Sequence, residues 1–204
     1  MIEDIRICFV GDSFVQGVGD PEYRGWIGRV LEATGEGMTA FNLGLRRDTS
    51  EDVLQRWRRE ALPRFLPGAD NRLVVSFGSN DMVEEGGAVR VEAARCVRNL
   101  ELLLDGCRDR GVTPFVVGPP PVADAGDAHL RRTVALADAM EGACRERYVP
   151  FVATTSELAA DPVWTGEALA GDGAHPGGGG YGRLAALVLA GQWHEWIRQP
   201  LRDS

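Results

Sequence analysis

The chain has 204 residues, of which 44% are hydrophobic and 25% are charged, a balance typical of one soluble globular domain rather than a disordered or fibrous protein. It contains no lysine, so all 22 basic side chains are arginine, and 30 acidic residues bring the formal net charge to −8. The lack of lysine excludes Schiff-base chemistry and the usual phosphate-binding P-loop, and the acidic balance argues against a nucleic-acid partner.

Short apolar runs alternate with longer amphipathic segments along the chain, a pattern typical of parallel strands joined by crossover helices. The predicted strands are Ile5–Val10, Met38–Leu43, Leu73–Phe77, Thr113–Gly118 and Val149–Thr154. Apolar residues at helical spacing predict four helices. These are Ser50–Arg59, Val89–Arg110, Leu130–Arg147 and Tyr181–Ile197, and Ser50 is the predicted cap of the first. The segment Thr155–Gly171 is predicted to be a loop.

No repeat or long linker divides this series, so residues 1–204 are predicted to form a single domain. Right-handed crossovers place helices on both faces of a parallel sheet. The expected fold class is therefore α/β, with a three-layer α/β/α sandwich around five parallel strands. In such folds the functional site lies outside the carboxyl ends of the strands.

The cysteines and the first residues bear on the compartment. Cys8, Cys96, Cys107 and Cys144 include no Cys-x-x-Cys pair and no histidine at metal-ligand spacing, so we expect free thiols and no metal site. The first residues do not resemble a signal peptide, and no apolar run is long enough for a membrane span. A cytoplasmic location is the expectation, and the oligomeric state cannot be predicted.

Polar residues follow three predicted strands and precede the last helix. The groups are Gly11-Asp12-Ser13, Asn42-Leu43-Gly44, Gly78-Ser79-Asn80-Asp81 and Asp172-Gly173-Ala174-His175. A serine hydroxyl becomes a good nucleophile only when a base takes its proton, and a histidine base needs a carboxylate on its other ring nitrogen. Ser13, His175 and Asp172 are therefore a candidate catalytic triad. The N–H groups of Ser13 and Gly44 and the Asn80 amide are candidate donors to an oxyanion.

These four groups, in this order, resemble the sequence blocks of the SGNH hydrolases, also called GDSL esterases and lipases. The resemblance spans nearly the whole chain. It implies a flavodoxin-like sheet of order 2-1-3-4-5 and ester hydrolysis without a cofactor. It also implies Ser13 as nucleophile and oxyanion donor, Gly44 and Asn80 as the other donors, His175 as base and Asp172 as the residue that orients it.

Simpler roles are possible for several of these residues. Ser13 alone would often cap a helix, and Asn80 alone would usually be a turn residue. Asp12 is interpreted as a hydrogen-bonding loop residue and Asp81 as a brace of its loop. The other histidines, His129 and His194, are predicted to lie on the surface.

Arg46 and Arg47 depart from the family pattern, in which many members have glycine or uncharged residues. They are candidate ligands for an anionic part of the substrate, because a guanidinium offers several donors in one plane. The alternative is a salt bridge to a nearby acid, of which Asp48, Glu51 and Asp52 are the candidates. Trp164 is a candidate for the substrate pocket wall, and burial against the sheet is the alternative.

The function that these residues predict is a serine esterase that cleaves carboxylic esters, with short acyl chains favoured, through a covalent acyl-enzyme. The expected partner is a small-molecule ester, with no metal, cofactor or nucleic acid. A carbohydrate deacetylase, a thioesterase or a lysophospholipase could use the same residues. A non-catalytic module that binds acylated ligands is the alternative from another class.

Overall fold

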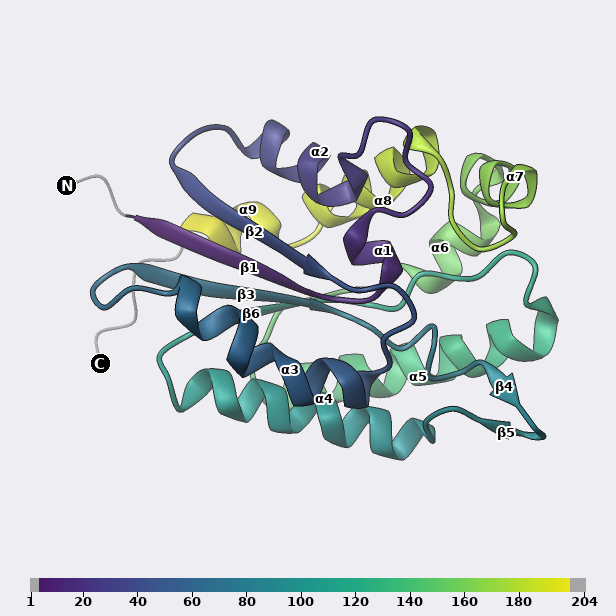
Figure 1. Cartoon of the computed structure of the whole chain (residues 1–204), viewed down its shortest axis with the longest axis horizontal. Coiled ribbons are helices and arrows are strands. Elements are labelled where there is room, and N and C mark those ends of the chain that lie inside the picture. Colours follow the sequence, from purple (N-terminus) through teal and green to yellow (C-terminus); the bar gives the residue numbers. More distant parts are fainter. Residues whose placement is uncertain (1–3, 199–204) are drawn as a thin grey trace.

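A five-stranded parallel sheet of order β2-β1-β3-β6-β7 forms the centre of the molecule (Figure 1). The computed structural model describes residues 4–198. The strands are β1 (Ile5–Gly11), β2 (Met38–Gly44), β3 (Asp70–Ser76), β6 (Thr113–Val117) and β7 (Phe151–Val152). They correspond in chain order to the five predicted strands, so the predicted order 2-1-3-4-5 is confirmed. A separate antiparallel hairpin joins β4 (Glu84–Glu85) and β5 (Ala88–Val89).

Both faces of the sheet are covered by helices, as Figure 1 shows. Along β1, Ile7 and Phe9 belong to one apolar core, whereas the alternate residues Cys8 and Val10 belong to the other. The second core includes residues of α3 (Ser50–Ala61), α4 (Ala93–Arg108) and α5 (Gly126–Glu146). The first includes residues of α2 (Gly25–Thr34), α8 (Gly178–Ala190) and α9 (Trp193–Arg198). The three-layer α/β/α sandwich is thus confirmed.

Some predicted boundaries differ from the structure. The cap of α3 is Thr49 rather than Ser50, because the Thr49 side chain accepts from the Asp52 N–H and Asp52 binds back to the Thr49 N–H. The predicted helix from Val89 begins at Ala93, since Ala88–Val89 pairs as β5. The predicted final helix is divided into α8 and α9 at Gly191, which ends α8.

The predicted loop 155–171 is instead helical, with α6 (Thr155–Ala160) and α7 (Pro162–Ala170). The Asp161 side chain accepts the N–H groups of Val163 and Trp164, and Pro162 occupies the first helical position. This Asp-Pro pair is a typical helix start, since proline has the helical φ and lacks only an N–H that would be unpaired there. Among the described residues, no helix combines the length and apolarity that a membrane crossing needs.

The strand register brings three chain segments to one level at the carboxyl edge of the sheet. Gly11, the last residue of β1, pairs with Gly44 on one side and with Ser76 on the other. The residues that follow these three positions therefore leave the sheet side by side. This edge holds the predicted serine, glycine and asparagine groups.

Candidate active site

Ser13 lies where β1 turns into the short helix α1 (Ser13–Gln16). The Asp12 carboxylate caps this helix, with Oδ1 accepting the Phe14 N–H at 2.9 Å. The helix ends at Gly17, whose φ of 84° is left-handed, a conformation that glycine adopts without steric cost. Ser13 is therefore the first helical residue, held at a fixed place at the sheet edge.

His175 joins Ser13 to Asp172. Its Nε2 lies 2.7 Å from Ser13 Oγ, and its Nδ1 lies 2.8 Å from Asp172 Oδ2. A neutral ring with its proton on Nδ1 satisfies both contacts, because it donates to the carboxylate and accepts from the hydroxyl. The structure thus brings together the three residues of the predicted triad in the geometry expected of a nucleophile, a base and an orienting acid.

The Asp172 carboxylate is fixed by its own loop. Its Oδ1 accepts the backbone N–H groups of Ala174 at 3.1 Å and His175 at 2.9 Å. Burial raises the pKa of this carboxyl, but the hydrogen bonds from His175 and Ala174 outweigh it and lower the pKa to about 2. Asp172 is consequently ionised at neutral pH.

An aromatic row packs against the imidazole. The ring centroids of His175 and Phe14 are 5.1 Å apart, and those of Phe14 and Trp164 are 5.8 Å apart. Trp164 in turn packs edge-on to Tyr181, and its Nε1 donates to the Pro121 carbonyl at 3.2 Å. Trp164 has no exposed surface, so its predicted place in a substrate wall is corrected to the alternative, burial in the core.

Asn80 lies in the loop that follows β3. Its Nδ2 donates to the Asp48 carbonyl at 3.0 Å and is 3.4 Å from Asp12 Oδ2. Asp81 accepts the Ser50 N–H at the start of α3, as its predicted role as a brace requires. The Asn80 amide therefore lies between the loop after β1 and the loop after β2.

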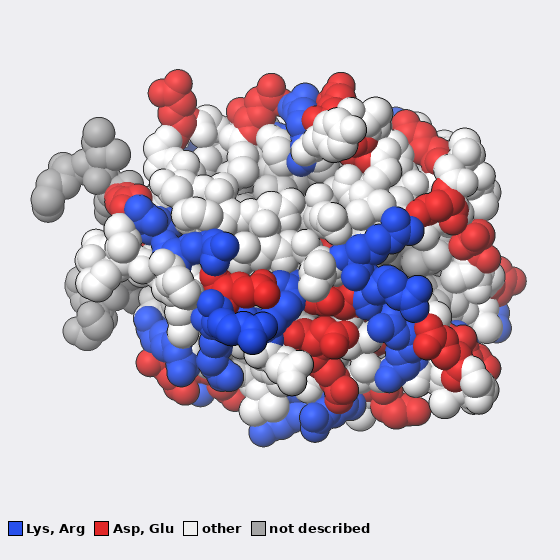
Figure 2. All heavy atoms as spheres, in the orientation of Figure 1, with Lys and Arg blue, Asp and Glu red and all other residues white. Residues whose placement is uncertain are grey.

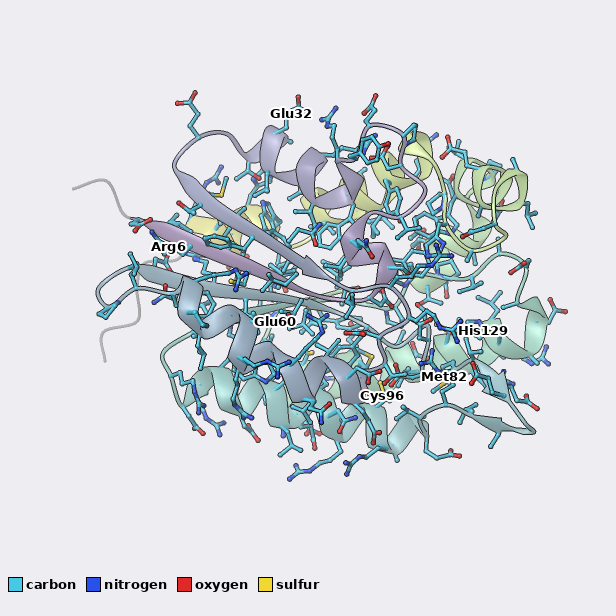
Figure 3. All side chains as sticks on the ribbon, viewed as in Figure 1. Arg6, Glu32, Glu60, Met82, Cys96 and His129 are labelled. Atoms are coloured by element: carbon cyan, nitrogen blue, oxygen red, sulfur yellow. The ribbon has the colours of Figure 1, made fainter. Side chains whose placement is uncertain are left out.

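The carbonyl of Ser79 in the same loop is 3.0 Å from Nε2 of His129 on α5. His129 is only 3% exposed, and Figure 3 labels it at this edge of the sheet, near Met82. The prediction that His129 is a surface residue is wrong, because its ring holds the loop that carries Asn80. Burial lowers the pKa of His129, which favours the neutral ring.

The N–H of Gly44, a predicted oxyanion donor, donates to Asn42 Oδ1 at 2.9 Å. A Cβ at this position would lie 2.2 Å from the backbone N of Gln16. Position 44 therefore needs a glycine because α1 crosses it closely. The structure gives this glycine a packing role.

Arg47 has an unusual backbone three residues beyond Gly44. Its φ of 74° is left-handed, which an arginine adopts only at a steric cost. Its carbonyl accepts from Arg90 at 3.0 Å, whereas its N–H has no partner in the described part of the chain. Arg47 directly precedes Asp48, whose carbonyl accepts from the Asn80 amide.

The side chains of Arg46 and Arg47 bind none of the acids that the sequence suggested. Arg46 contacts Asp172 at 3.2 Å, and Arg47 lies 3.7 Å from Glu85. The suggested acids have other partners: Asp48 binds Arg56, Glu51 binds Arg95 and Asp52 binds Thr49.

Arg56 on α3 is a site residue that the sequence alone does not reveal. It is 7% exposed and donates to the carbonyls of Gly11 at 2.8 Å and Leu43 at 2.9 Å. It also binds Asp48 Oδ2 at 2.5 Å. One guanidinium thus connects the ends of β1 and β2 to the loop that carries Arg47.

Asp12 is completely buried beside the serine. Burial raises the pKa of its carboxyl, the nearby Asp81 and Asp48 add to this effect, and the hydrogen bond from Phe14 opposes it, so that the pKa is about 7. Asp12 shapes the site through the helix cap and its contact with Asn80, as expected for a hydrogen-bonding loop residue.

Comparison with known proteins agrees with this geometry. A family model described as GDSL-like Lipase/Acylhydrolase family matches residues 9–183. The uncharacterized protein YpmR of Bacillus subtilis (strain 168) is 24% identical over 161 residues, which are 76% of this chain and 56% of that protein. The chain therefore spans little more than half the length of this curated relative.

Solved structures share the fold. A lipase/acylhydrolase from Enterococcus faecalis superposes with a TM-score of 0.72 at 24% identity, over 98% of this chain and 100% of the other. A catalytic mutant of an acetylxylan esterase from Geobacillus stearothermophilus gives 0.76 at 18% identity, over 97% and 98% of the two chains. An esterase from Pseudoalteromonas sp., solved with monoethylphosphonate as inhibitor, gives 0.73 at 14% identity, over 96% and 100%.

Proposed function

Because the chain belongs to the GDSL-like lipase/acylhydrolase family, a family of ester hydrolases, we propose that it is a serine esterase that cleaves carboxylic esters through a covalent acyl-enzyme. The observation that carries this proposal is the hydrogen-bonded row Ser13, His175 and Asp172, with contacts of 2.7 and 2.8 Å. A pocket that only bound acylated ligands would need no base on the serine hydroxyl.

In the proposed acylation, Ser13 Oγ forms a bond to the ester carbonyl carbon while its proton moves to His175 Nε2. The imidazolium then gives this proton to the alcohol oxygen as the carbon–oxygen bond breaks. In the second half, water attacks the acyl carbon and gives a proton to His175 Nε2. The bond from this carbon to Ser13 Oγ then breaks, His175 returns the proton to Oγ, and the carboxylic acid leaves. Asp172 remains ionised and stabilises the imidazolium.

The negative charge on the carbonyl oxygen needs preorganised donors. We assign the N–H of Ser13 and the Asn80 amide to this role. Asn80 Nδ2 donates one of its two hydrogens to the Asp48 carbonyl, at an N–O distance of 3.0 Å. Its contact with Asp12 Oδ2 is longer, at 3.4 Å, so we assign the second hydrogen to the oxyanion. As the third donor we propose the Arg47 N–H in place of Gly44, since this N–H has no partner among the described residues and Arg47 directly precedes Asp48, the residue whose carbonyl Asn80 binds.

Short acyl groups are the proposed substrates. The site is framed by brief connections, residues 45–49 between β2 and α3 and residues 171–177 between α7 and α8, and a long acyl chain needs an extended apolar groove. A carbohydrate deacetylase is the second candidate, because the acetylxylan esterase has the same fold.

The test is turnover of para-nitrophenyl esters from acetyl to decanoyl, run beside acetylated xylo-oligosaccharides and acyl thioesters. We expect the rate to fall with acyl length and Ser13→Ala to abolish it with no change in thermal unfolding. Turnover by Ser13→Ala equal to that of the wild type would reject the assignment of the nucleophile.

A further inference from the structure

The guanidinium of Arg46 contacts Asp172, a residue of the proposed triad. Arg46 Nη2 is 3.2 Å from Asp172 Oδ2, the same oxygen that receives His175 Nδ1. Arg46 belongs to the loop after β2, whereas Asp172 precedes α8, 126 residues later. The contact therefore joins two loops that border Ser13. The backbone of Arg46 is itself anchored, because its N–H donates to Gln16 Oε1 on α1 at 3.1 Å.

Asp172 does not depend on this cation. Its two oxygens already accept the N–H groups of Ala174 and His175 and the His175 ring. The Arg46 and Asp172 side chains are 55% and 42% exposed, and an exposed ion pair of this kind contributes only about 0 to 1 kcal/mol. The guanidinium can thus exchange Asp172 for another anion at little cost.

Basic residues gather at this part of the surface although the whole chain carries a net charge of −8. Arg47 is 74% exposed, and its carbonyl accepts from Arg90. Figure 2 shows a blue group to the right of the centre, where Figure 1 places the loop after β2 and the approach to the β4–β5 hairpin. Glu85 of that hairpin and Asp172 are the acids that these arginines contact.

We propose that Arg46 is a specificity-determining residue that binds an anionic group, a carboxylate or a phosphate, carried by the ester substrate. This inference rests on the proposed esterase function and names its substrate class. The planar guanidinium can bind two oxygens of such a group at once. When the substrate enters, Arg46 leaves Asp172 for that group, and Arg47 lies beside it on the same loop.

The experiment compares pairs of esters in which one member carries an anionic group and the other is neutral. Para-acetoxybenzoate and its methyl ester place the anion on the alcohol side. Mono-para-nitrophenyl glutarate and its methyl ester place it on the acyl side. Para-acetoxyphenyl phosphate and phenyl acetate distinguish phosphate from carboxylate. The ratio of kcat/KM within each pair measures the preference for charge independently of how well the protein folds.

The variants are Arg46→Gln, Arg46→Lys and, as a matched control, Arg108→Gln. Arg108 is also exposed and paired, with Asp105 at 3.1 Å, but it ends α4 at the opposite edge of the sheet. We expect the wild type to prefer the anionic member of at least one pair by about tenfold, which corresponds to roughly 1.4 kcal/mol. Arg46→Gln should abolish most of this preference, mainly through KM, Arg46→Lys should retain part of it, and Arg108→Gln should leave it intact.

Two results would overturn the inference: no preference for the anion in any pair, or equal losses on charged and neutral esters in Arg46→Gln. Either result, with neutral esters still hydrolysed, would leave the proposed esterase function standing. If the wild type hydrolysed no ester and Ser13 did not react with a fluorophosphonate, the proposed function itself would fail.

Discussion

His175 Nε2 lies 2.7 Å from Ser13 Oγ, although 162 residues separate the two in the sequence. The distance is that of a hydrogen bond from hydroxyl to imidazole. One residue follows the first strand of the sheet and the other precedes α8, so only the assembled fold brings them into contact. The contact on which the proposed reactivity of Ser13 depends is thus made only in the folded protein.

Hydrolysis should be slow at acid pH, because the proposed base His175 must be neutral to accept the proton of Ser13. The pKa of Asp172 is lowered to about 2, so this carboxylate remains ionised at all higher pH. Because a protonated imidazole cannot accept this proton, kcat/KM should rise from acid towards neutral pH. Initial rates between about pH 4 and pH 9 measure this. A rate that stays level over the range would contradict His175 as the base.

Asp12→Asn should become relatively more stable than the wild type as the pH rises. The folded-state pKa of Asp12 is raised to about 7 from the ordinary value of 3.8. Between these values the native protein holds a proton that the unfolded chain has lost, so the stability of the wild type falls with increasing pH. The asparagine side chain of the variant cannot ionise, and its Oδ1 can still accept from Phe14.

Urea unfolding at about pH 5 and pH 8 tests this prediction. The difference in unfolding free energy between Asp12→Asn and the wild type should change by more than about 1 kcal/mol in favour of the variant. Parallel pH dependence in the two proteins would show that Asp12 titrates alike in the folded and unfolded states.

Arg56→Leu should destabilise the fold strongly. The substitution removes the guanidinium from the buried Asp48 carboxylate, and it removes one donor from each of the carbonyls of Gly11 and Leu43. Removing one partner of a buried ion pair costs about 3 to 5 kcal/mol. Urea denaturation provides the measurement, with Arg59→Leu as the control, since Arg59 is exposed on the same helix. Similar losses of unfolding free energy in the two variants would show that the buried contacts of Arg56 do not stabilise the fold.

Two substitutions at Arg47, both of which remove the arginine side chain, should show the effect of its left-handed backbone. Glycine suits the left-handed φ of 74°, and it keeps the N–H, so Arg47→Gly should be more stable than Arg47→Val by roughly 1 kcal/mol or more. It should also have the higher kcat on a neutral ester, because the N–H keeps its direction. Thermal unfolding and initial rates compare the two. A higher kcat in the valine variant would exclude the proposed oxyanion donor.

The sheet and the triad could be predicted from the sequence because both depend on local patterns. Buried parallel strands are short apolar runs bounded by glycine and proline, and Asp172 and His175 are three residues apart. Ser13 follows a strand whose end is clear from composition. The family resemblance joined these separate groups into one site.

The remaining features depend on distances that no local pattern fixes. Arg56 is one of 22 arginines, and only the packing of α3 against the ends of β1 and β2 distinguishes it. Gly44 follows the second strand as an oxyanion donor would, yet its N–H binds Asn42 and its missing Cβ makes room for α1. His129 lies at the start of a predicted helix, where the sequence pattern does not indicate a core position. It is buried because α5 packs beside the loop that contains Ser79.

Reaction of the protein with a fluorophosphonate, followed by peptide mass spectrometry, tests the proposed nucleophile most directly. We expect one adduct, on Ser13, that forms in the wild type, is absent in Ser13→Ala and is greatly slowed in His175→Ala. An adduct on another serine, or none in a protein that still hydrolyses esters, would contradict the assignment of Ser13.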